Sequence, residues 1–278
     1  MNTNAPVVLI SGCSTGIGRA LAVEFAARNW RVFATARKPE VINDLKAPNV
    51  DVTVLDVTDE TSIKACVDSV ITKTGRIDML VNNAGLLLIG PLVELETSEL
   101  RHQFETNVIG LNALTRAAVP HMIKRKSGKI VNISSVSGVL PTPFAGAYCS
   151  TKAAVTALSD SLRMELAPFG INVVTVQPGG IKSNLSGNAD KGLGRFRKTP
   201  YGPIQEFIVA RANASQENAT PAEVFAKELV DKLERKKTPK FIRVGKDSTL
   251  LPLIARFPRA LTDALLSKKF GLNKLSAG

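Results

Sequence analysis

The residues of this sequence best suited to chemistry are Tyr148 and Lys152, four positions apart in a stretch of helical periodicity. On a helix, side chains at i and i+4 lie on one face and touch each other. A phenol with a pKa near ~10 is a poor base at neutral pH. An ammonium ~4 Å away stabilises the phenolate by roughly 4 kcal/mol at an effective dielectric of about 20. The pair therefore predicts a general acid or base at Tyr148 whose pKa is lowered by Lys152.

A glycine-rich segment near the N-terminus predicts a phosphate-binding turn. It follows a short apolar run, opens a helical pattern and spaces its glycines as GxxxGxG. Glycine lets the backbone turn tightly and approach a pyrophosphate, which the N-terminus of the following helix stabilises. The alternative is a tight connection without a ligand, but the strand–turn–helix context favours a dinucleotide cofactor. The expected contacts are Gly12, Ser14, Thr15, Gly16, Ile17 and Gly18.

The residues after the expected second strand indicate which dinucleotide is bound. Proteins that bind NAD place an acidic residue there for the 2′-hydroxyl of the ribose. This chain has Arg37 and Lys38 instead, and its next carboxylate is Glu40. A guanidinium can bind a 2′-phosphate through two hydrogen bonds, so the cofactor is expected to be NADP(H). After the third strand, Asp56, followed by Val57, is expected to accept a hydrogen bond from the adenine amino group.

The elements that must position these residues alternate along the chain. Short runs rich in Val, Ile and Leu predict strands at 7–10, 31–35, 52–55, 79–81, 129–133, 172–177 and 239–244. Helical patterns lie between them, at 18–29, 62–73, 98–126, 148–167 and 221–235. Such alternation is typical of an α/β fold, a doubly wound parallel sheet of the Rossmann type with about seven strands and helices on both faces. Ligands of such sheets bind beyond the carboxyl ends of the strands, where the motifs fall.

The length of 278 residues predicts a single dinucleotide-binding and catalytic domain, 1–278. Two stretches interrupt the alternation. Residues 182–216 contain many Gly and Pro and exceed what a connection needs, so we expect a substrate lid there. Residues 250–278 are apolar and basic together, in a spacing that predicts an amphipathic helix or pair broken near Pro258.

Composition excludes several classes of protein. No apolar run is long enough to span a bilayer, and residues 1–6 lack a secretory pattern, so we expect a cytoplasmic protein. Cys13, Cys66 and Cys149 are widely spaced and predict small reduced core residues, with no metal site and no nucleophile at Cys149. The net charge of +12 fits an anionic cofactor and a solvated surface. Its basic clusters carry no interleaved aromatic residues, so no nucleic-acid partner is expected.

Further motifs follow the expected fourth, fifth and sixth strands: Asn82-Asn83-Ala84-Gly85, Ser134-Ser135 and Pro178-Gly179. With the glycine turn, Asn107 and the Tyr148–Lys152 pair, they make the chain resemble the short-chain dehydrogenase/reductase family over about residues 7–245. Any one of these motifs alone is weak, but their number and order are specific. The glycine turn with Ala34-Thr35-Ala36-Arg37 is similar to 17β-hydroxysteroid and retinol dehydrogenases. The segment 266–272 is similar to NADPH-dependent 1-acyldihydroxyacetone-phosphate reductases.

The resemblance implies a role for each matching residue. Tyr148 protonates the carbonyl oxygen or removes the alcohol proton, and Ser135 donates a hydrogen bond to that oxygen. Lys152 lowers the pKa of Tyr148 and holds the nicotinamide ribose, while Asn107 supports a water relay to Lys152. The residues implied to lie along the cofactor are Asn83, Ala84, Gly85, Pro178, Gly179 and Ile181, with Ser183 where the family usually has Thr.

The expected activity is hydride transfer between NADP(H) and a ketone, an aldehyde or a secondary alcohol, as in a carbonyl reductase with a bulky hydrophobic substrate. The alternative is a catalytically inactive nicotinamide-binding sensor or scaffold, and the presence of Asn107, Ser135, Tyr148 and Lys152 counts against it. An enoyl reductase or epimerase of the same fold usually alters the Ser or the Tyr spacing, and neither is altered here.

Two expectations concern partners. Apolar positions such as Leu111, Leu114 and Val119 on one long helix, and Val155, Leu158 and Leu162 on another, exceed what one sheet face covers, so we expect a homodimer or homotetramer. The tail 250–278 is expected to close the substrate pocket or pack on a neighbouring subunit. The alternative is a peripheral membrane contact, with apolar side chains in lipid and basic ones at anionic headgroups.

Overall fold

The computed structural model describes residues 5–184 and 192–275, which are built around one parallel sheet of seven strands. The strand order is β3-β2-β1-β4-β5-β6-β7, and every neighbouring pair is parallel. This is the doubly wound, Rossmann-type sheet that the sequence predicts. The strands are β1 Val7–Ile10, β2 Arg31–Ala36, β3 Val50–Val54, β4 Met79–Asn82, β5 Gly128–Ile133, β6 Ile171–Pro178 and β7 Phe241–Val244.

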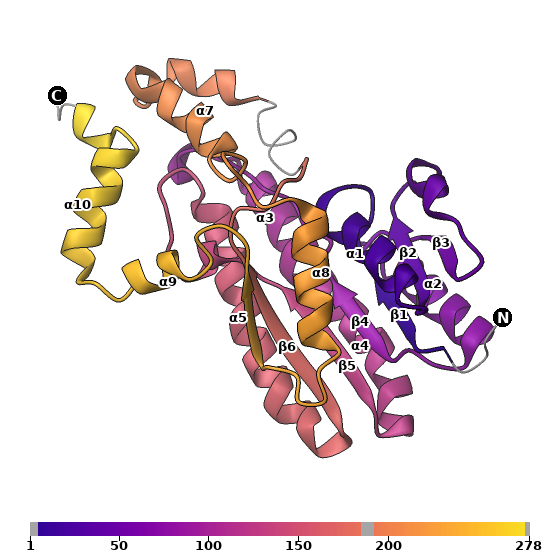
Figure 1. Cartoon of the computed structure of the whole chain (residues 1–278). Coiled ribbons are helices and arrows are strands. Elements are labelled where there is room, and N and C mark those ends of the chain that lie inside the picture. The colour runs from indigo at the N-terminus through magenta and orange to yellow at the C-terminus, as the bar shows by residue number, and fades with distance from the viewer. Residues whose placement is uncertain (1–4, 185–191, 276–278) are drawn as a thin grey trace.

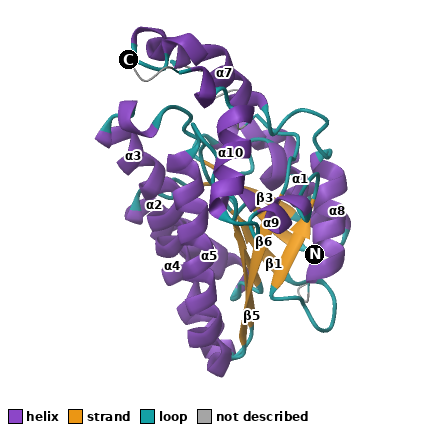
Figure 2. Cartoon of the chain, turned by 90° about the vertical axis from the view of Figure 1, so that its left-hand side faces the viewer, coloured by secondary structure: helices purple, strands orange, loops and turns teal. Residues whose placement is uncertain are grey.

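Helices cover both faces of the sheet (Figure 2). One face carries α1 Gly16–Ala27 and α8 Ala222–Leu233, whose buried Leu21, Phe25, Phe225 and Leu229 join the strand side chains in one core cluster. The other carries α2 Glu60–Thr74, α4 Gly110–Arg125 and α5 Gly146–Leu166, with a second core cluster beneath them. Because the central strands are buried on both sides, β1 and β4 have only buried residues, as their unbroken apolar runs predict.

The expected continuous helix at 98–126 is wrong in one respect. The structure divides it into α3 Thr97–Phe104, a π-helical turn Glu105–Ile109 and α4. Asn107 lies inside that turn, and its buried amide bonds to the backbone of Leu86 and to the hydroxyl of Thr151. These contacts are tertiary, so helical periodicity alone could not reveal the interruption. π-turns of this kind occur frequently at functional sites.

A third apolar cluster lies above the sheet, outside the two faces. It joins α7 Gln205–Asn213, within the expected lid, to residues after β4 and to Phe270 near the C-terminus. After β7 the chain forms α9 Leu250–Ile254 and α10 Arg259–Lys269, which lie to one side of the sheet in Figure 1. Pro258 separates the two helices, as the sequence predicts. Residues 185–191 of the expected lid lie outside the described residues.

Short turns complete the chain: Pro39–Leu45, Leu92–Glu94, Val136–Gly138, Ala167–Phe169, Leu193–Lys198, Gly202–Ile204 and Leu272–Lys274. The three cysteines are buried and unbonded, as expected of core residues. Within residues 5–184 and 192–275, no helix combines the length and the apolar character that crossing a membrane requires. The same residues contain no cluster of His, Cys, Asp and Glu able to hold a metal ion.

Candidate active site

One cavity of about 900 Å³ lies at the carboxyl ends of the strands, where a doubly wound sheet places its ligands. At one end it is lined by residues after β1, β2 and β3, and at the other by residues of α5, α7 and the C-terminal helices. Its volume falls within the range of about 300–1,000 Å³ usual for ligand pockets. Of the residues expected to act in catalysis or to bind the cofactor, all but Gly18 and Asn107 border this space.

The glycine turn lies between β1 and α1, against the residues that follow β4. Gly12 has φ +74°, and a Cβ atom there would stand 2.8 Å from the Cα of Ala84. Asn83 fastens the turn, because its side-chain Nδ2 donates to the carbonyls of Ser11 and Gly12, both at 2.9 Å. Gly18 has a packing role, since a Cβ there would lie 2.3 Å from the carbonyl oxygen of Gly12.

The N-terminus of α1 faces the cavity through Ser14, Thr15, Gly16 and Ile17. The N-cap residue Thr15 makes no side-chain capping bond, and the first turn carries no acidic residue. The first N–H groups of a helix need acceptors, and a phosphate can supply them. The turn therefore suits the pyrophosphate of a dinucleotide.

Arg37, Lys38 and Asp56 meet at the same end of the cavity. Partial burial would raise the pKa of the Asp56 carboxyl. Hydrogen bonds from the backbone and hydroxyl of Thr58, with the nearby charge of Arg37, hold that pKa below its ordinary value. Asp56 is therefore an anionic acceptor beside two cations, and Val57 lines the wall next to it.

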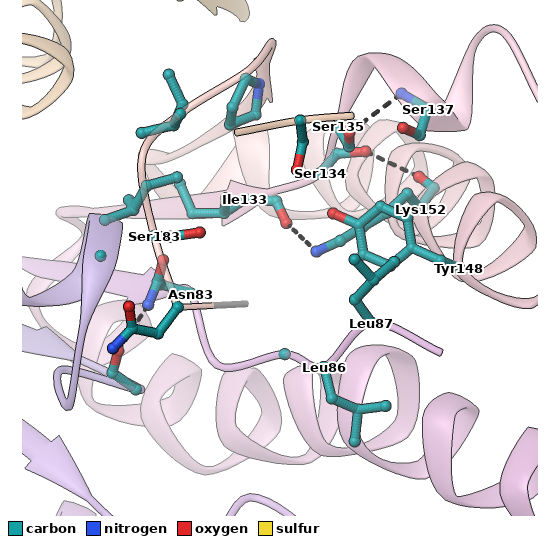
Figure 3. A pocket seen from close by; sticks show the side chains of 18 of the residues that line it. Asn83, Leu86, Leu87, Ile133, Ser134, Ser135, Ser137, Tyr148, Lys152 and Ser183 are labelled. Atoms are coloured by element: carbon teal, nitrogen blue, oxygen red, sulfur yellow. Dashed lines mark hydrogen bonds between the residues drawn. The ribbon is translucent and has the colours of Figure 1, made fainter. Parts of the chain in front are cut away.

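Tyr148, Ser135 and Lys152 converge at the other end of the cavity, as Figure 3 shows. The ammonium of Lys152 donates to the carbonyl oxygen of Ile133 at 2.7 Å and lies 5.6 Å from the centre of the Tyr148 ring. The Ser135 hydroxyl accepts from the backbone N–H of Ser137 at 3.1 Å and also hydrogen-bonds Tyr148. Two hydroxyls thus lie together at one point of the cavity.

Burial has a larger influence on the pKa of Tyr148 than the nearby charges, and the lowering of this pKa by Lys152 stays a prediction. Burial raises the pKa of Tyr148 to about 12, although the hydrogen bond from Ser135 and the charge of Arg211 act against it. Burial also lowers the pKa of Lys152 to about 8, because its ammonium is fully removed from water. The sequence argument counted the charge of the lysine and underestimated the cost of desolvating both groups.

Asn107 lies behind the cavity wall. Its Oδ1 accepts from the N–H of Leu86 at 2.9 Å, and its Nδ2 donates to the carbonyl of Leu86 and to the hydroxyl of Thr151, both at 3.0 Å. Its side-chain oxygen lies close to Gly85, where an added Cβ would stand 3.2 Å away. Asn107 therefore positions the loop that carries Gly85 and Leu86 along the cavity (Figure 3 shows Leu86).

Two neighbours of the catalytic candidates have structural surroundings. The Ser134 hydroxyl donates to the carbonyl of Lys152 at 2.8 Å and pairs with Thr156, which ties the end of β5 to α5. Cys149 is buried in the third apolar cluster.

The segment after β6 forms the remaining wall, with Pro178, Gly179, Ile181 and Ser183 along the cavity. Gln216 fixes this segment, accepting from the N–H of Ser183 at 2.9 Å and donating to the carbonyl of Ile181 at 3.2 Å. Sequence reasoning missed Gln216, Thr142 and Arg211, all of which line the cavity. Arg211 and Gln216 belong to the expected lid, but no motif distinguishes them there.

These surroundings fit a nicotinamide dinucleotide. An uncapped helix N-terminus and a close-packed glycine turn lie midway, two cations and a carboxylate stand at one end, and a tyrosine, a serine and a lysine stand at the other.

Known proteins match this chain along most of its length. The family model of short chain dehydrogenases matches residues 6–194. An uncharacterised oxidoreductase, YusZ of Bacillus subtilis, is 33% identical over 96% of this chain and 99% of its own. The NADPH-dependent 1-acyldihydroxyacetone phosphate reductase of Schizosaccharomyces pombe is 34% identical over 78% of this chain and 73% of its own. A crystal structure of a short-chain dehydrogenase from Streptomyces avermitilis is 34% identical, covers 98% of both chains and has a TM-score of 0.78.

Proposed function

The chain belongs to the short-chain dehydrogenase/reductase family, and from this premise we propose that it is an NADP(H)-dependent carbonyl reductase with a bulky hydrophobic substrate. The observation that carries the proposal is the convergence of Tyr148, Ser135 and Lys152 on the cavity whose opposite end holds Arg37 and Lys38. When bound, the nicotinamide cofactor supplies the hydride for reduction of a ketone or aldehyde, or accepts it from a secondary alcohol.

The protein's part in the reaction is to bind the carbonyl oxygen and to protonate it. Ser135 accepts from the N–H of Ser137 and hydrogen-bonds Tyr148; its hydroxyl proton turns from Tyr148 to the substrate oxygen when a substrate binds. Tyr148 keeps its proton at neutral pH, because burial raises its pKa to about 12. A protonated phenol is the form that donates to a carbonyl oxygen.

Several residues would hold the cofactor. The N–H groups at the start of α1 suit the pyrophosphate, and Asp56 suits the adenine amino group. Arg37 and Lys38 suit a 2′-phosphate, and the relative from Schizosaccharomyces pombe is named as NADPH-dependent. Lys152, with Asn83, Ala84 and Gly85, suits the nicotinamide end. Together these contacts support NADP(H) over NAD(H).

The substrate end of the cavity supports a bulky apolar substrate. Its walls include Leu87, Leu140, Leu251, Leu266 and Phe270, from four separate parts of the chain. Closure of this space by the lid at 182–216 and by the tail at 250–278 is part of the proposal, since Arg211 and Phe270 both line it. A single catalytic domain is proposed with it.

The test is NADPH consumption against steroid, retinoid, acyl-ketone phosphate and aryl ketone substrates. Turnover of at least one ketone is expected, with NADPH preferred to NADH. NADPH binding without turnover of any of them would instead favour the sensor or scaffold.

A homodimer or homotetramer is also proposed. Of the six residues expected to support it, Leu111, Leu114 and Val155 are buried within the protomer, which is a correction to that expectation. The remaining apolar support is the half-buried Val119, Leu158 and Leu162, with exposed Ile109 and Met164. Light scattering at micromolar concentration tests the assembly, and a monomer there contradicts it. A cytoplasmic location stays a prediction.

A peripheral membrane contact through the tail is proposed as well. Its exposed apolar side chains are Leu250, Leu253, Phe257, Leu261 and Leu265, and the basic Arg256, Arg259 and Lys268 stand among them. Apolar and cationic side chains on one surface segment suit the interface of an anionic membrane.

A further inference from the structure

Arg211 is a buried cation whose presence the proposed reaction does not explain. It lies on α7, and only 8% of its surface is exposed. Its neighbours Ile208 and Ala212 are fully buried in the third apolar cluster, so the helix that carries it is held firmly against the body. Burial of a charge is costly unless the charge is paired.

The structure gives Arg211 one polar partner among the described residues. Its Nε donates to the hydroxyl of Thr142 at 2.9 Å, and no carboxylate of those residues forms an ion pair with it. Thr142 also lines the cavity. The hydrogen bond at Nε fixes the plane of the guanidinium and leaves its two terminal nitrogens for another acceptor.

Arg211 lines the same cavity as Ser135, Tyr148 and Lys152. Its charge acts to lower the pKa of Tyr148. The carboxylates that line the cavity are Asp56, at the cofactor end beside Arg37, and Asp247, which does not contribute to the charge balance of Arg211. The substrate end is therefore positive, since Lys152 and Lys269 line it together with Arg211.

We propose that Arg211 binds an anionic group of the substrate, a carboxylate or a phosphate close to the carbonyl that is reduced. The guanidinium fork matches the oxygens of either group in a bidentate manner. The apolar walls around Leu87, Leu266 and Phe270 take the remainder of the molecule. This inference rests on the proposed function and narrows its substrate class to anionic, amphipathic ketones.

The test compares matched substrates that differ only in charge. One pair is a long-chain keto acid and its methyl ester, and the other is a long-chain ketone phosphate and the corresponding alcohol. The wild type is expected to prefer the anionic member of at least one pair, and the pair that responds distinguishes a carboxylate from a phosphate. Equal kcat/KM for both members of both pairs overturns the inference.

Arg211→Gln removes the charge and keeps a polar side chain. It should lower kcat/KM for the anionic ketone roughly 30- to 1,000-fold and leave the neutral partner almost unchanged, because only the former loses a buried charge pair. Arg211→Lys should keep part of the preference, since an ammonium supplies charge without the fork. The matched control is Arg197→Gln, an exposed arginine of the same segment that does not line the cavity.

A loss that is equal for charged and neutral substrates means that Arg211 only supports α7, and it overturns the inference. A binding measurement separates this outcome from failure of the proposed function. A long-chain hydroxy acid and its methyl ester are titrated by calorimetry into the protein, with and without NADPH. The acid should bind the wild type and Arg211→Lys more tightly than Arg211→Gln, even if no ketone is turned over. If the wild type and Arg211→Gln bind the acid equally tightly, the inference is contradicted.

Discussion

At the scale of single residues, Tyr148 is the proton donor nearest the proposed reacting oxygen, and Ser135 shares that position with it. Tyr148→Phe keeps the ring and removes the proton. We expect kcat to fall roughly 10²- to 10⁴-fold while NADPH affinity stays within a few-fold, because general acid catalysis is lost and the cofactor contacts remain. Steady-state kinetics and fluorescence titration of NADPH measure the two effects.

Tyr201 supplies the control for that variant. It packs against Phe144 in the third apolar cluster and does not line the cavity. Tyr201→Phe should therefore leave kcat nearly unchanged. Substantial turnover by Tyr148→Phe would remove Tyr148 from its role.

Cofactor choice is a second property of single residues. Arg37→Asp replaces the proposed partner of the 2′-phosphate with a repelling charge, and preference should shift from NADPH toward NADH, with Lys38 making the smaller contribution. The ratio of kcat/KM for the two cofactors measures the shift. Arg235→Asp, at an exposed arginine outside the cavity, is the matched control. A wild type that uses NADH as efficiently as NADPH contradicts the argument.

Lys152 gives a prediction for pH. In the cofactor-free protein its pKa is about 8, against 10.5 for an ordinary lysine, because burial disfavours the ammonium. Between pH 8 and pH 10.5 the unfolded chain binds a proton at Lys152 that the native protein has released. The free energy of unfolding therefore rises with pH through this window. The stability gained in this way is lost again as the pH falls through about 8. The contribution amounts to about 3 kcal/mol.

Lys152→Met removes the titration and isolates this contribution. The free energy of unfolding of the variant minus that of the wild type should be largest below about pH 8 and should fall by about 3 kcal/mol toward pH 10.5. Urea unfolding of both proteins, followed by circular dichroism across this window, provides the comparison. A difference in unfolding free energy that is constant with pH contradicts the burial of a lysine with a lowered pKa.

At the scale of elements, the π-turn Glu105–Ile109 brings Asn107 to the loop after β4. Asn107→Ala leaves polar groups of Leu86 and Thr151 without their partner, which should lower the free energy of unfolding by about 1–3 kcal/mol. It should also lower kcat, since the loop beside Gly85 and Lys152 loses its support. Urea unfolding and steady-state kinetics measure both.

Gln103 offers a matched control for the π-turn. It is fully buried on α3 and holds the same loop, accepting from the N–H of Leu88 and donating to the carbonyl of Leu86. Gln103→Ala should cost similar stability with a smaller loss of kcat, because the side-chain hydrogen bonds of Gln103 are to the loop, whereas Asn107 also bonds Thr151 on α5. Equal losses of kcat in both variants indicate that Asn107 contributes to stability alone.

At the scale of the whole molecule, the C-terminal tail has two different faces. Phe270 is buried and lines the cavity with Leu266, whereas Leu253, Phe257 and Leu261 are exposed. Deletion of residues 250–278 should therefore abolish activity without any lipid present. The full chain should float with anionic liposomes at low salt, and a triple serine variant at the three exposed positions should not. If the intact protein stays with the soluble fraction, the membrane proposal fails.

The sequence by itself determined the fold and the positions of the chemical groups. The strand runs, such as 7–10 and 79–81, are buried on both faces, so their apolar character is visible without any tertiary information. The glycine turn, Ser135 and the Tyr148–Lys152 pair depend on local spacing within or just after one element, and the structure brings them to one cavity. The family resemblance added Asn107 to the candidate site residues. Its place on a helix could be predicted from the sequence, but the hydrogen bonds of its side chain could not.

Only the tertiary structure decided the properties that depend on distant parts of the chain. The pKa of Tyr148 is raised because the lid and the neighbouring loops bury its side chain. The i, i+4 spacing of Tyr148 and Lys152 cannot predict this burial. The π-turn follows from bonds between Asn107 and residues 21 and 44 positions away. Nothing in the sequence distinguishes Arg211 from the other arginines of this basic chain. Folding buries it in the cavity that Tyr148 also lines, without a carboxylate partner among the described residues. Desolvation and pairing are set by what surrounds a group in space, and spacing along the chain does not carry that information.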